Sequence, residues 1–397
     1  MFVVGVAVTA MLLIRTIAGN TLSYNAESRL SNTIYGKDKD HVLELRTGDT
    51  SKSTIREKAA IVALVMNTEL EKLKYTIRQF EERWNSKYNY PYVFFNDIPF
   101  SDDFKEGIQA VTNANVTYVD LSADYWSIPA HVDLAKVIRS HKKNKSRFIY
   151  GGKLSYQLMC RFQSLGFYNH PALASYKYYW RIEPDVGYFC DINYDPFHFM
   201  AKNGLKYGFT IAIHELANTV ETLWTTTVDW VLKNKDMLPE ENNAKWILRG
   251  DGDYNGCHYW SNFEIVDMDF YRSKEYTSYV DYLDLSGGFF YERWGDAPIH
   301  SIAASLLLPK EKLFWFDDIG YRHDTLHICP TNKNLDNNCV CDMQGSLHDY
   351  ECLRNWRNYP STSKQYVLSH LSKFEKRHRP KDNPDYLKDP NPRPIAI

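Results

Sequence analysis

The sequence predicts an α/β fold in which helices flank a mixed, mostly parallel sheet. Strand-like and helix-like patterns alternate along the body of the 397-residue chain, as they do in folds with parallel sheets. The composition, 44% hydrophobic and 24% charged, is that of a globular protein with a large core. The net charge is −2, so no basic excess indicates nucleic-acid binding.

The first predicted elements follow one another closely. An unbroken apolar run from Ala59 to Met66 predicts a buried strand, and the amphipathic stretch from Glu69 to Trp84 predicts a helix. A second strand is expected at 92–97. The short run 147–150 leads into a helical stretch at 153–165.

The segment 178–192, YYWRIEPDVGYFCDI, reads as a strand that two carboxylates interrupt. Ligands gather at the carboxyl ends of strands in such sheets, and Glu183 and Asp185 lie at one such end. A buried carboxylate is costly unless a cation or hydrogen-bond donors satisfy it. A strand at 207–213 and a helix at 218–232 continue the alternation.

The two ends of the chain differ from its body. Residues 1–19 contain an apolar run shorter than the roughly 20 residues of a bilayer span. They predict a signal-anchor, with a signal peptide cleaved near Ala18 as the alternative. The polar segment 20–54 is expected to be a stem, and the charged, proline-rich segment 376–397 a flexible tail. Between them, 55–375 is expected to form one large luminal domain.

Cysteines and glycosylation motifs agree with a lumen. Four of the seven cysteines cluster in a loop-rich region: Cys329, Cys339, Cys341 and Cys352. In an oxidising compartment this cluster predicts disulfides. A zinc site is the alternative, although the spacing between Cys339 and Cys341 is shorter than zinc sites prefer. The sequons Asn115-Val-Thr and Asn144-Lys-Ser would be usable in the same compartment.

Four long blocks are rich in rare residues: YYWRIEPDVGYFCDI, YNGCHYWSNFEI at 254–265, GGFFYERWGDAPIHSIAASL at 287–306, and DDIGYRHD at 317–324. They resemble the signature blocks of the fungal Golgi α-1,2-mannosyltransferases, glycosyltransferase family 15. The resemblance runs in order from about residue 59 to 355. It implies a GT-A type fold in a single large catalytic domain, GDP-mannose as donor, Mn²⁺ as cofactor and retention of anomeric configuration.

The resemblance also implies a metal site. Transfer from a sugar nucleotide must stabilise a departing diphosphate, and acidic residues that hold a divalent cation are the usual solution. Glu183 and Asp185 resemble the family's metal-binding carboxylates, with Glu183 as the more direct ligand, and His323 matches the family's metal histidine. A carboxylate that caps a helix or pairs with Arg181 is the structural alternative. His300, in a helical pattern, is expected to be buried.

Glu264, in WSNFEI, corresponds to the glutamate that the family offers as nucleophile. Its apolar flanks predict a poorly solvated carboxylate near the anomeric carbon. Retention needs such a group for a covalent intermediate or for stabilising an oxocarbenium-like transition state, and the sequence leaves both open. A glutamate bonded to backbone amides at a strand end is the structural alternative.

The resemblance assigns four further positions. Tyr156 matches a tyrosine near the donor phosphates. Met66 stands where the family has an arginine turned toward the nucleotide, and losing that charged partner would cost about 1.5–3 kcal/mol of donor binding. Asp296 resembles a residue that faces the acceptor sugar, and Trp260 would stack on that sugar.

The function implied is transfer of mannose from GDP-mannose to mannose-containing acceptors, in N- or O-linked glycan elongation or cell-wall mannan synthesis. The enzyme would be a single-pass type II Golgi membrane protein with a luminal catalytic domain. A mannoside-active glycoside hydrolase is one alternative, since it too uses paired carboxylates. A non-catalytic glycan-binding relative is the other, prompted by Met66.

Overall fold

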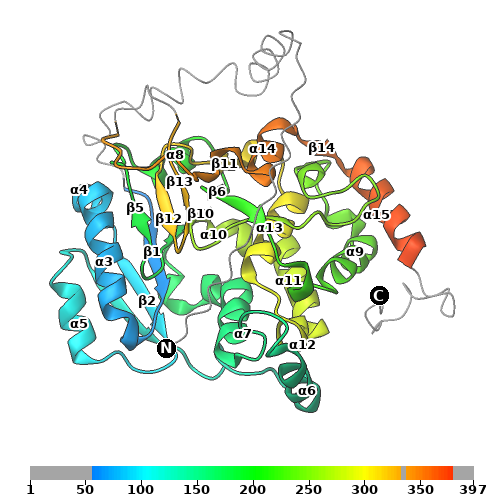
Figure 1. Cartoon of the computed structure of the whole chain (residues 1–397), viewed down its shortest axis with the longest axis horizontal. Coiled ribbons are helices and arrows are strands. Elements are labelled where there is room, and N and C mark those ends of the chain that lie inside the picture. Colours follow the sequence, from blue (N-terminus) through cyan, green and yellow to red (C-terminus); the bar gives the residue numbers. More distant parts are fainter. Residues whose placement is uncertain (1–55, 332–336, 379–397) are drawn as a thin grey trace, which may run out of the picture. The chain divides into compact units, whose positions relative to one another are not determined.

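The computed structural model describes residues 56–331 and 337–378 (Figure 1). The predicted anchor at 1–19 and stem at 20–54 lie outside the described residues, as do residues 379–397 of the predicted tail. Within the described ranges, no helix has both the length and the apolar character needed to cross a membrane.

A seven-stranded mixed sheet forms the centre, in the order β11-β6-β10-β4-β1-β2-β3. Its strands are β1 (Ala59–Leu64), β2 (Tyr92–Asn96), β3 (Val116–Asp120), β4 (Tyr178–Arg181), β6 (Tyr207–Phe209), β10 (Glu264–Asp267) and β11 (Leu313–Trp315). Only β10 is antiparallel to its neighbours, β4 and β6. All other pairs are parallel. The prediction of a mixed, mostly parallel sheet is therefore confirmed.

Three small sheets accompany the central one. Their strands are β5 (Gly187–Tyr188), β12 (Tyr321–His323) and β13 (Leu326–Ile328); β7 (Ala212–His214) and β9 (Cys257–Tyr259); and β8 (Glu241–Asn242) and β14 (Thr362–Ser363). Figure 1 shows β5, β12 and β13 together beside the central sheet. The strand expected at 207–213 is thus split between β6 and β7, because Ile211 between them turns its carbonyl to the backbone of Trp260.

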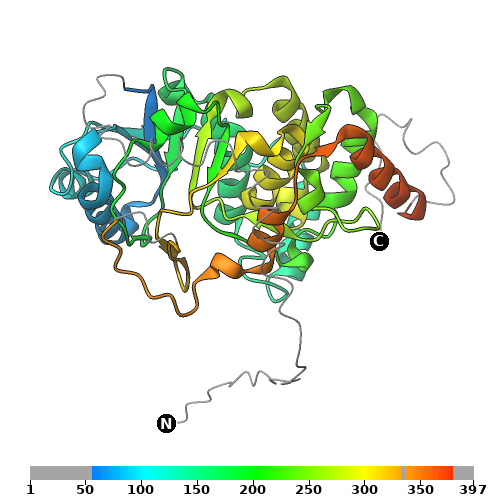
Figure 2. The same ribbon diagram turned by 90° about the horizontal axis from the view of Figure 1, so that it is seen from above.

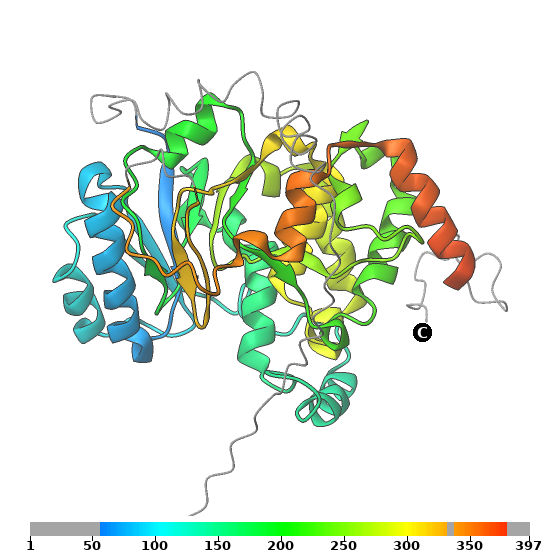
Figure 3. The same cartoon turned by 45° about the horizontal axis from the view of Figure 1, so that its top comes forward.

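Helices cover both faces of the central sheet, with α3 and α5 on one side and α7, α11 and α13 on the other (Figures 1 and 2). The helices are α3 (Leu70–Phe80), α4 (Ser86–Tyr88), α5 (Asp102–Gln109), α6 (Leu134–Asn144), α7 (Leu154–Arg161), α8 (Pro196–Lys202), α9 (Leu223–Lys233), α10 (Met268–Tyr271), α11 (Lys274–Ser286), α12 (Gly288–Tyr291), α13 (Asp296–Leu307), α14 (Glu351–Asn358) and α15 (Lys364–His378). Figure 3 shows the same two helical layers from an intermediate direction.

The predicted helices at 69–84, 153–165 and 218–232 correspond to α3, α7 and α9, and α3 and α7 each continue into a π-helical turn. The run 147–150, which precedes α7, forms turns. Helix α15 continues to His378, three residues past the predicted domain end at 375. The helix persists because Phe374 and Glu375 in its last turns are buried.

Three disulfides form, Cys190–Cys339, Cys257–Cys352 and Cys329–Cys341, and the first two join parts of the chain that are 149 and 95 residues apart. The prediction of disulfides in place of a zinc site is confirmed. Two members of the cysteine cluster pair with Cys190 and Cys257, which lie outside it. His214 is near the Cys257–Cys352 bridge, but sulfurs joined in a disulfide are not thiolate ligands.

Candidate active site

The candidate site forms where β4 ends. Arg181, the last residue of this strand, is only 4% exposed. Its guanidinium donates to Glu183 at 2.5 Å and to Asp296 at 2.5 Å. Burial would lower the pKa of Arg181, but these two carboxylates raise it well above its ordinary value. A buried guanidinium needs such partners, so Arg181 fixes two acidic side chains from different elements beside each other.

Glu183 faces His323 as well as Arg181. Nε2 of His323 lies 3.1 Å from Oε2 of Glu183, although the two residues are 140 apart in the sequence. Strand β12 brings His323 here by pairing with β5, which follows Glu183. Burial would raise the pKa of Glu183, but Arg181 and His323 lower it to about 2. The pair is therefore an anionic carboxylate beside an imidazole, each side chain about one quarter exposed.

This pair fits a divalent transition-metal ion. Carboxylate oxygen and imidazole nitrogen are both suitable ligands for Mn²⁺. Nδ1 of His323 is buried and has no hydrogen-bond partner among the described residues, so the ring retains an unused polar atom here. Two protein ligands would leave coordination positions for phosphate oxygens, as is common where an ion is shared with a nucleotide.

Asp185 does not join the pair. It adopts a left-handed backbone conformation with φ of +66°, and its N–H donates to the carbonyl of Lys72 at 3.2 Å. This turn leaves its side chain exposed. In the described part of the chain, the ligand atoms of Asp185, Glu183 and His323 do not all lie within 4.8 Å of one another. As a third ligand, Asp185 stays a prediction.

The two predicted acceptor residues adjoin the pair. Asp296, the first residue of α13, is 5% exposed and accepts from Arg181 and from the Ser261 hydroxyl at 2.7 Å. Burial would raise the pKa of Asp296, but Arg181 is the main influence that lowers it to about 2. The Trp260 ring lies edge to face against His323, with centroids 4.9 Å apart. The structure therefore groups Glu183, His323, Asp296 and Trp260.

Glu264 lies behind this group, on β10, in register with Arg181 of β4. Its side chain has no exposed surface. Three hydroxyls donate to its carboxylate: that of Tyr179, that of Tyr207 at 2.8 Å and that of Tyr271 at 3.2 Å. Burial raises the pKa of each of these tyrosines well above its ordinary value, so they remain protonated donors.

His300 completes the surroundings of Glu264. It is fully buried in α13, as expected. Nδ1 lies 3.0 Å from Oε2 of Glu264, and Nε2 lies 3.1 Å from the Gln163 carbonyl. Because a carbonyl only accepts, Nε2 carries a proton, and the Glu264 contact is an ion pair when Nδ1 carries one too. The prediction of a buried carboxylate is confirmed, with side chains as its donors.

Tyr156 lies on α7 in a second polar group. Its hydroxyl accepts from Arg293 at 2.9 Å, and Arg293 also donates to Glu215 at 3.2 Å. The ring of Tyr156 stacks on Tyr150, with centroids 4.6 Å apart. A Cβ on Gly295 would be 3.5 Å from the Glu215 carboxylate, so this group borders Asp296. The arrangement leaves a hydroxyl beside a buried cation, which suits an anionic ligand.

Met66 lies just past the end of β1 and is 47% exposed. Its backbone N–H donates to the Glu69 carboxylate at 2.9 Å. The carboxyl end of β1, next to β4 in the sheet, is at the same edge as Glu183. Met66 therefore offers an exposed apolar side chain at the edge where the resemblance expects the nucleotide.

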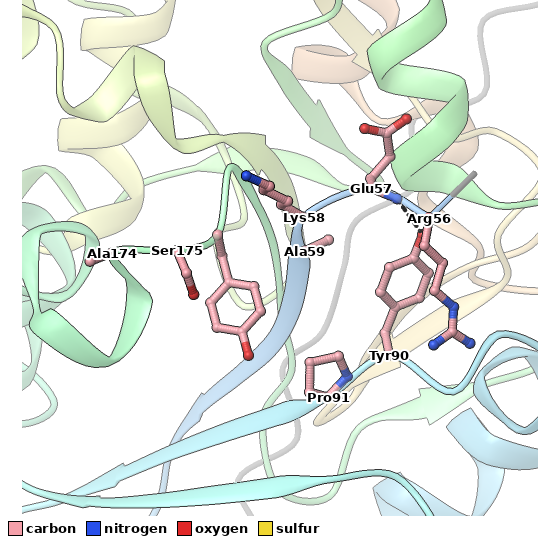
Figure 4. A pocket seen from close by; sticks show the side chains of 9 residues that line it. Arg56, Glu57, Lys58, Ala59, Tyr90, Pro91, Ala174 and Ser175 are labelled. Atoms are coloured by element: carbon pink, nitrogen blue, oxygen red, sulfur yellow. Dashed lines mark hydrogen bonds between the residues drawn. The ribbon is translucent and has the colours of Figure 1, made fainter. Parts of the chain in front are cut away.

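A cleft of about 450 Å³ lies elsewhere, at the amino ends of β1 and β2 (Figure 4). The residues that line it include Arg56, Lys58, Tyr90, Pro91 and Tyr176. None of the predicted site residues is among its lining. The candidate site is therefore defined by converging side chains at the opposite edge of the sheet.

Arg293 and Glu215 were not predicted from the sequence, and Arg181 was expected only as a structural partner of a carboxylate. The signal for Arg181 was available, since it is a cation inside the otherwise apolar strand YYWR. An arginine that is buried with a strand must meet carboxylates. Glu215 gave no comparable signal, because it follows β7 in an ordinary polar loop.

Comparisons with known proteins agree with this geometry. The sequence model of the glycolipid 2-alpha-mannosyltransferase family matches residues 20–361. The glycolipid 2-alpha-mannosyltransferase of Saccharomyces cerevisiae is 45% identical over 302 residues, which cover 75% of this chain and 68% of the relative. The alpha-1,2 mannosyltransferase KTR1 of the same yeast is 43% identical over 322 residues, 80% of each chain.

Two solved structures resemble this one closely. Core-mannan synthase A of Aspergillus fumigatus, in an Mn/GDP form, has a TM-score of 0.70 and 38% identity, over 81% of this chain and 85% of that one. The mannosyltransferase Ktr4p of S. cerevisiae, in complex with GDP, has a TM-score of 0.75 and 34% identity, over 88% of this chain and 95% of that one.

Proposed function

The chain belongs to the glycolipid 2-alpha-mannosyltransferase family, and on that premise we propose that it transfers mannose from GDP-mannose to a mannose-containing acceptor in α-1,2 linkage. It is a metal-dependent glycosyltransferase with a GT-A type fold and uses Mn²⁺ as cofactor. Its products serve protein glycosylation or cell-wall mannan synthesis.

One observation carries the proposal. The Glu183 carboxylate and the His323 imidazole converge at 3.1 Å beside a buried arginine, at the carboxyl edge of the sheet. We assign Glu183 and His323 as the protein ligands of Mn²⁺. When bound, the ion neutralises charge on the departing diphosphate. Arg181 holds Glu183 in place for this role through the 2.5 Å contact.

Glu264 acts through its charge in this proposal, not through a covalent bond. All its carboxylate contacts are with buried donors, and its side chain has no exposed surface to meet the anomeric carbon. A fixed negative charge behind the site stabilises positive charge that develops on the sugar ring. Of the two mechanisms compatible with retention, the enclosure favours departure and attack on the same face.

The remaining side chains would bind the two substrates. Tyr156, held by Arg293 at 2.9 Å, donates to a donor phosphate, and Met66 contacts the nucleotide by its apolar surface alone. Asp296 accepts hydrogen bonds from acceptor hydroxyls, and Trp260, beside His323, stacks on the acceptor sugar.

We place the enzyme in the Golgi, as a single-pass type II protein with a luminal catalytic domain. The support is chemical: three disulfides join residues of the described chain, and such bonds persist in oxidising compartments. The anchor at residues 1–19 is proposed from the sequence alone.

The deciding experiment uses the purified chain, GDP-mannose, MnCl₂ and an array of mannosides, with the product linkage read by NMR. We expect an α-1,2-linked mannose product that a chelator prevents. Release of free mannose from the mannosides without GDP-mannose, surviving the chelator, would instead identify a hydrolase. Binding without any product would identify a glycan-binding relative.

A further inference from the structure

The chain contains two N-glycosylation sequons that the fold treats differently. One is Asn115-Val116-Thr117 and the other is Asn144-Lys145-Ser146. Both lie among the described residues. The sequence alone gives no reason to prefer either, so their surroundings must distinguish them.

Asn115 is presented at the surface. It directly precedes β3, the outermost strand of the central sheet at that side. Its carbonyl accepts from the backbone N–H of Tyr92 at 2.8 Å, which fixes the local backbone. The side chains of Asn115 and Thr117 are both exposed. The sequon is thus extended and open to solvent.

Asn144 is enclosed. It is the last residue of α6 and only 3% exposed. Its Nδ2 donates to the carbonyl of Tyr291 at 3.2 Å, and its Oδ1 accepts from Arg147 at 3.1 Å. A sugar on Nδ2 would need the space that the α12 backbone occupies. A glycan at this position is therefore incompatible with the fold.

We propose that Asn115 carries an N-linked glycan and that Asn144 does not. The proposal rests on the luminal placement proposed above. The co-reactant is an oligosaccharide linked through its anomeric carbon to a polyprenyl diphosphate. Nδ2 of Asn115 bonds to that carbon and releases a proton to solvent. The carbon–oxygen bond breaks, and the lipid diphosphate leaves with the electron pair.

The position suits a permanent modification. Strand β3 pairs only with β2 within the central sheet, and an edge strand offers unpaired backbone groups to other chains. A bulky hydrophilic glycan at its start would shield this edge. Asn115 precedes β3, at the end of the parallel strands opposite to Glu183, and β1 and β2 separate β3 from β4. We therefore expect the glycan to leave the active site open.

The test is expression of the full chain in a eukaryotic secretory host. Glycosylated asparagines are converted to ¹⁸O-labelled aspartate by enzymatic deglycosylation in H₂¹⁸O and located by peptide mass spectrometry. Asn115→Gln and Thr117→Ala remove the sequon, Thr117→Ser retains it, and Asn144→Gln removes the enclosed one. Alkylation of free thiols in the same preparation reports whether the disulfides formed.

We expect label at Asn115 in wild type, Thr117→Ser and Asn144→Gln, and no label in Asn115→Gln or Thr117→Ala. Transfer from GDP-mannose should agree within twofold between the glycosylated and deglycosylated enzyme. An unlabelled Asn115 in a chain with its disulfides formed, or label at Asn144, would overturn the glycan proposal alone. An unlabelled Asn115 in a chain with all cysteines alkylated would overturn the luminal placement as well.

Discussion

Glu183 and Glu264 are both neighbours of Arg181, Glu183 through a side-chain contact and Glu264 through the register of β10 with β4, yet their surroundings are opposite. Glu183 is 25% exposed and contacts Arg181 and His323. Glu264 has no exposed surface and receives three tyrosine hydroxyls and His300. Solvent access separates the two environments.

The difference indicates two kinds of electrostatic role. A partly solvated carboxylate with an imidazole opposite it has room for an external cation and phosphate oxygens. An enclosed carboxylate that four buried side chains contact keeps its charge fixed and exchanges no ligands. We infer that Glu183 changes partners during turnover, while Glu264 does not. Each prediction below tests one side of this comparison.

The largest expected effect concerns the open carboxylate. Glu183→Ala, His323→Ala or removal of divalent ions by a chelator should each lower transfer by at least about 10³-fold, or about 4 kcal/mol. The reason is loss of the ion that neutralises the diphosphate. Turnover and GDP affinity, measured with and without MnCl₂, check this. The Mn²⁺ dependence of GDP binding should disappear in both variants.

Asp185→Asn is the matched control. Its side chain is exposed and adds no third ligand atom within 4.8 Å of those of Glu183 and His323, so we expect rates within a few-fold of wild type. A loss equal to that of Glu183→Ala would instead support the prediction that Asp185 is a third ligand and show that the turn at 183–186 closes on the ion. Near wild-type rates in Glu183→Ala and His323→Ala would reject the metal assignment.

The enclosed carboxylate gives the second effect. Glu264→Gln keeps shape and size but removes the charge that stabilises a developing cation. Donor binding depends on contacts made elsewhere, so GDP affinity should be retained. The chemical step should fall by two to three powers of ten, about 3–4 kcal/mol. Measuring melting temperature, GDP affinity and kcat on one preparation separates charge from packing.

Two outcomes would revise this view of Glu264. A lower melting temperature with unchanged turnover per folded molecule would make Glu264 structural. A mannosyl adduct on Glu264, trapped with GDP-mannose and found by mass spectrometry, would show that the cluster opens and that the carboxylate attacks the sugar. We expect no adduct.

Most of the fold could be predicted from the sequence because its strands are strongly patterned. The apolar run at 59–66 and the periodic helix after it carry their own signals. The break between β6 and β7 could not be predicted, because it depends on where Trp260 and Trp315 find backbone acceptors. Disulfide partners were equally hidden, since cysteine spacing does not determine pairing.

The site residues likewise divide into those that the sequence predicts and those that only the structure reveals. Glu183, His323, Asp296 and Trp260 were found through motif resemblance, and the structure brings them together. The exposed turn at Asp185 could not be predicted from its motif. Aspartate occurs in both ordinary and left-handed backbone conformations, so the residue type alone does not reveal a positive φ. The tyrosines around Glu264 come from three different elements, so only the folded chain reveals them.

The third effect concerns Arg181, which contacts Glu183 and is in register with Glu264 of β10. Lysine in place of Arg181 keeps the charge but lacks the planar fork that reaches Glu183 and Asp296 together. Losing one charged hydrogen bond should cost about 1.5–3 kcal/mol of stability. We expect a lower melting temperature and weaker Mn²⁺-dependent GDP binding in Arg181→Lys. Unchanged values for both would mean that Glu183 is positioned without Arg181.

The smallest expected effect concerns Met66, which is solvent-exposed and lies at the same edge of the sheet as Glu183. Met66→Arg places a cation at the edge of the sheet where the nucleotide is expected, so the donor KM should fall about threefold to tenfold, with melting temperature unchanged. The side chain at this position is 47% exposed, and solvent screening keeps the gain below that of a buried charged hydrogen bond. The nearby Glu69 carboxylate, which accepts from the backbone N–H of Met66 at 2.9 Å, would compete for the new guanidinium and reduce the gain further.

Met66→Lys is the control, because a point charge attracts the phosphates without making a bidentate contact and should give a smaller fall in donor KM. An unchanged or higher KM in Met66→Arg would mean that the donor pocket is built around methionine and needs no cation there.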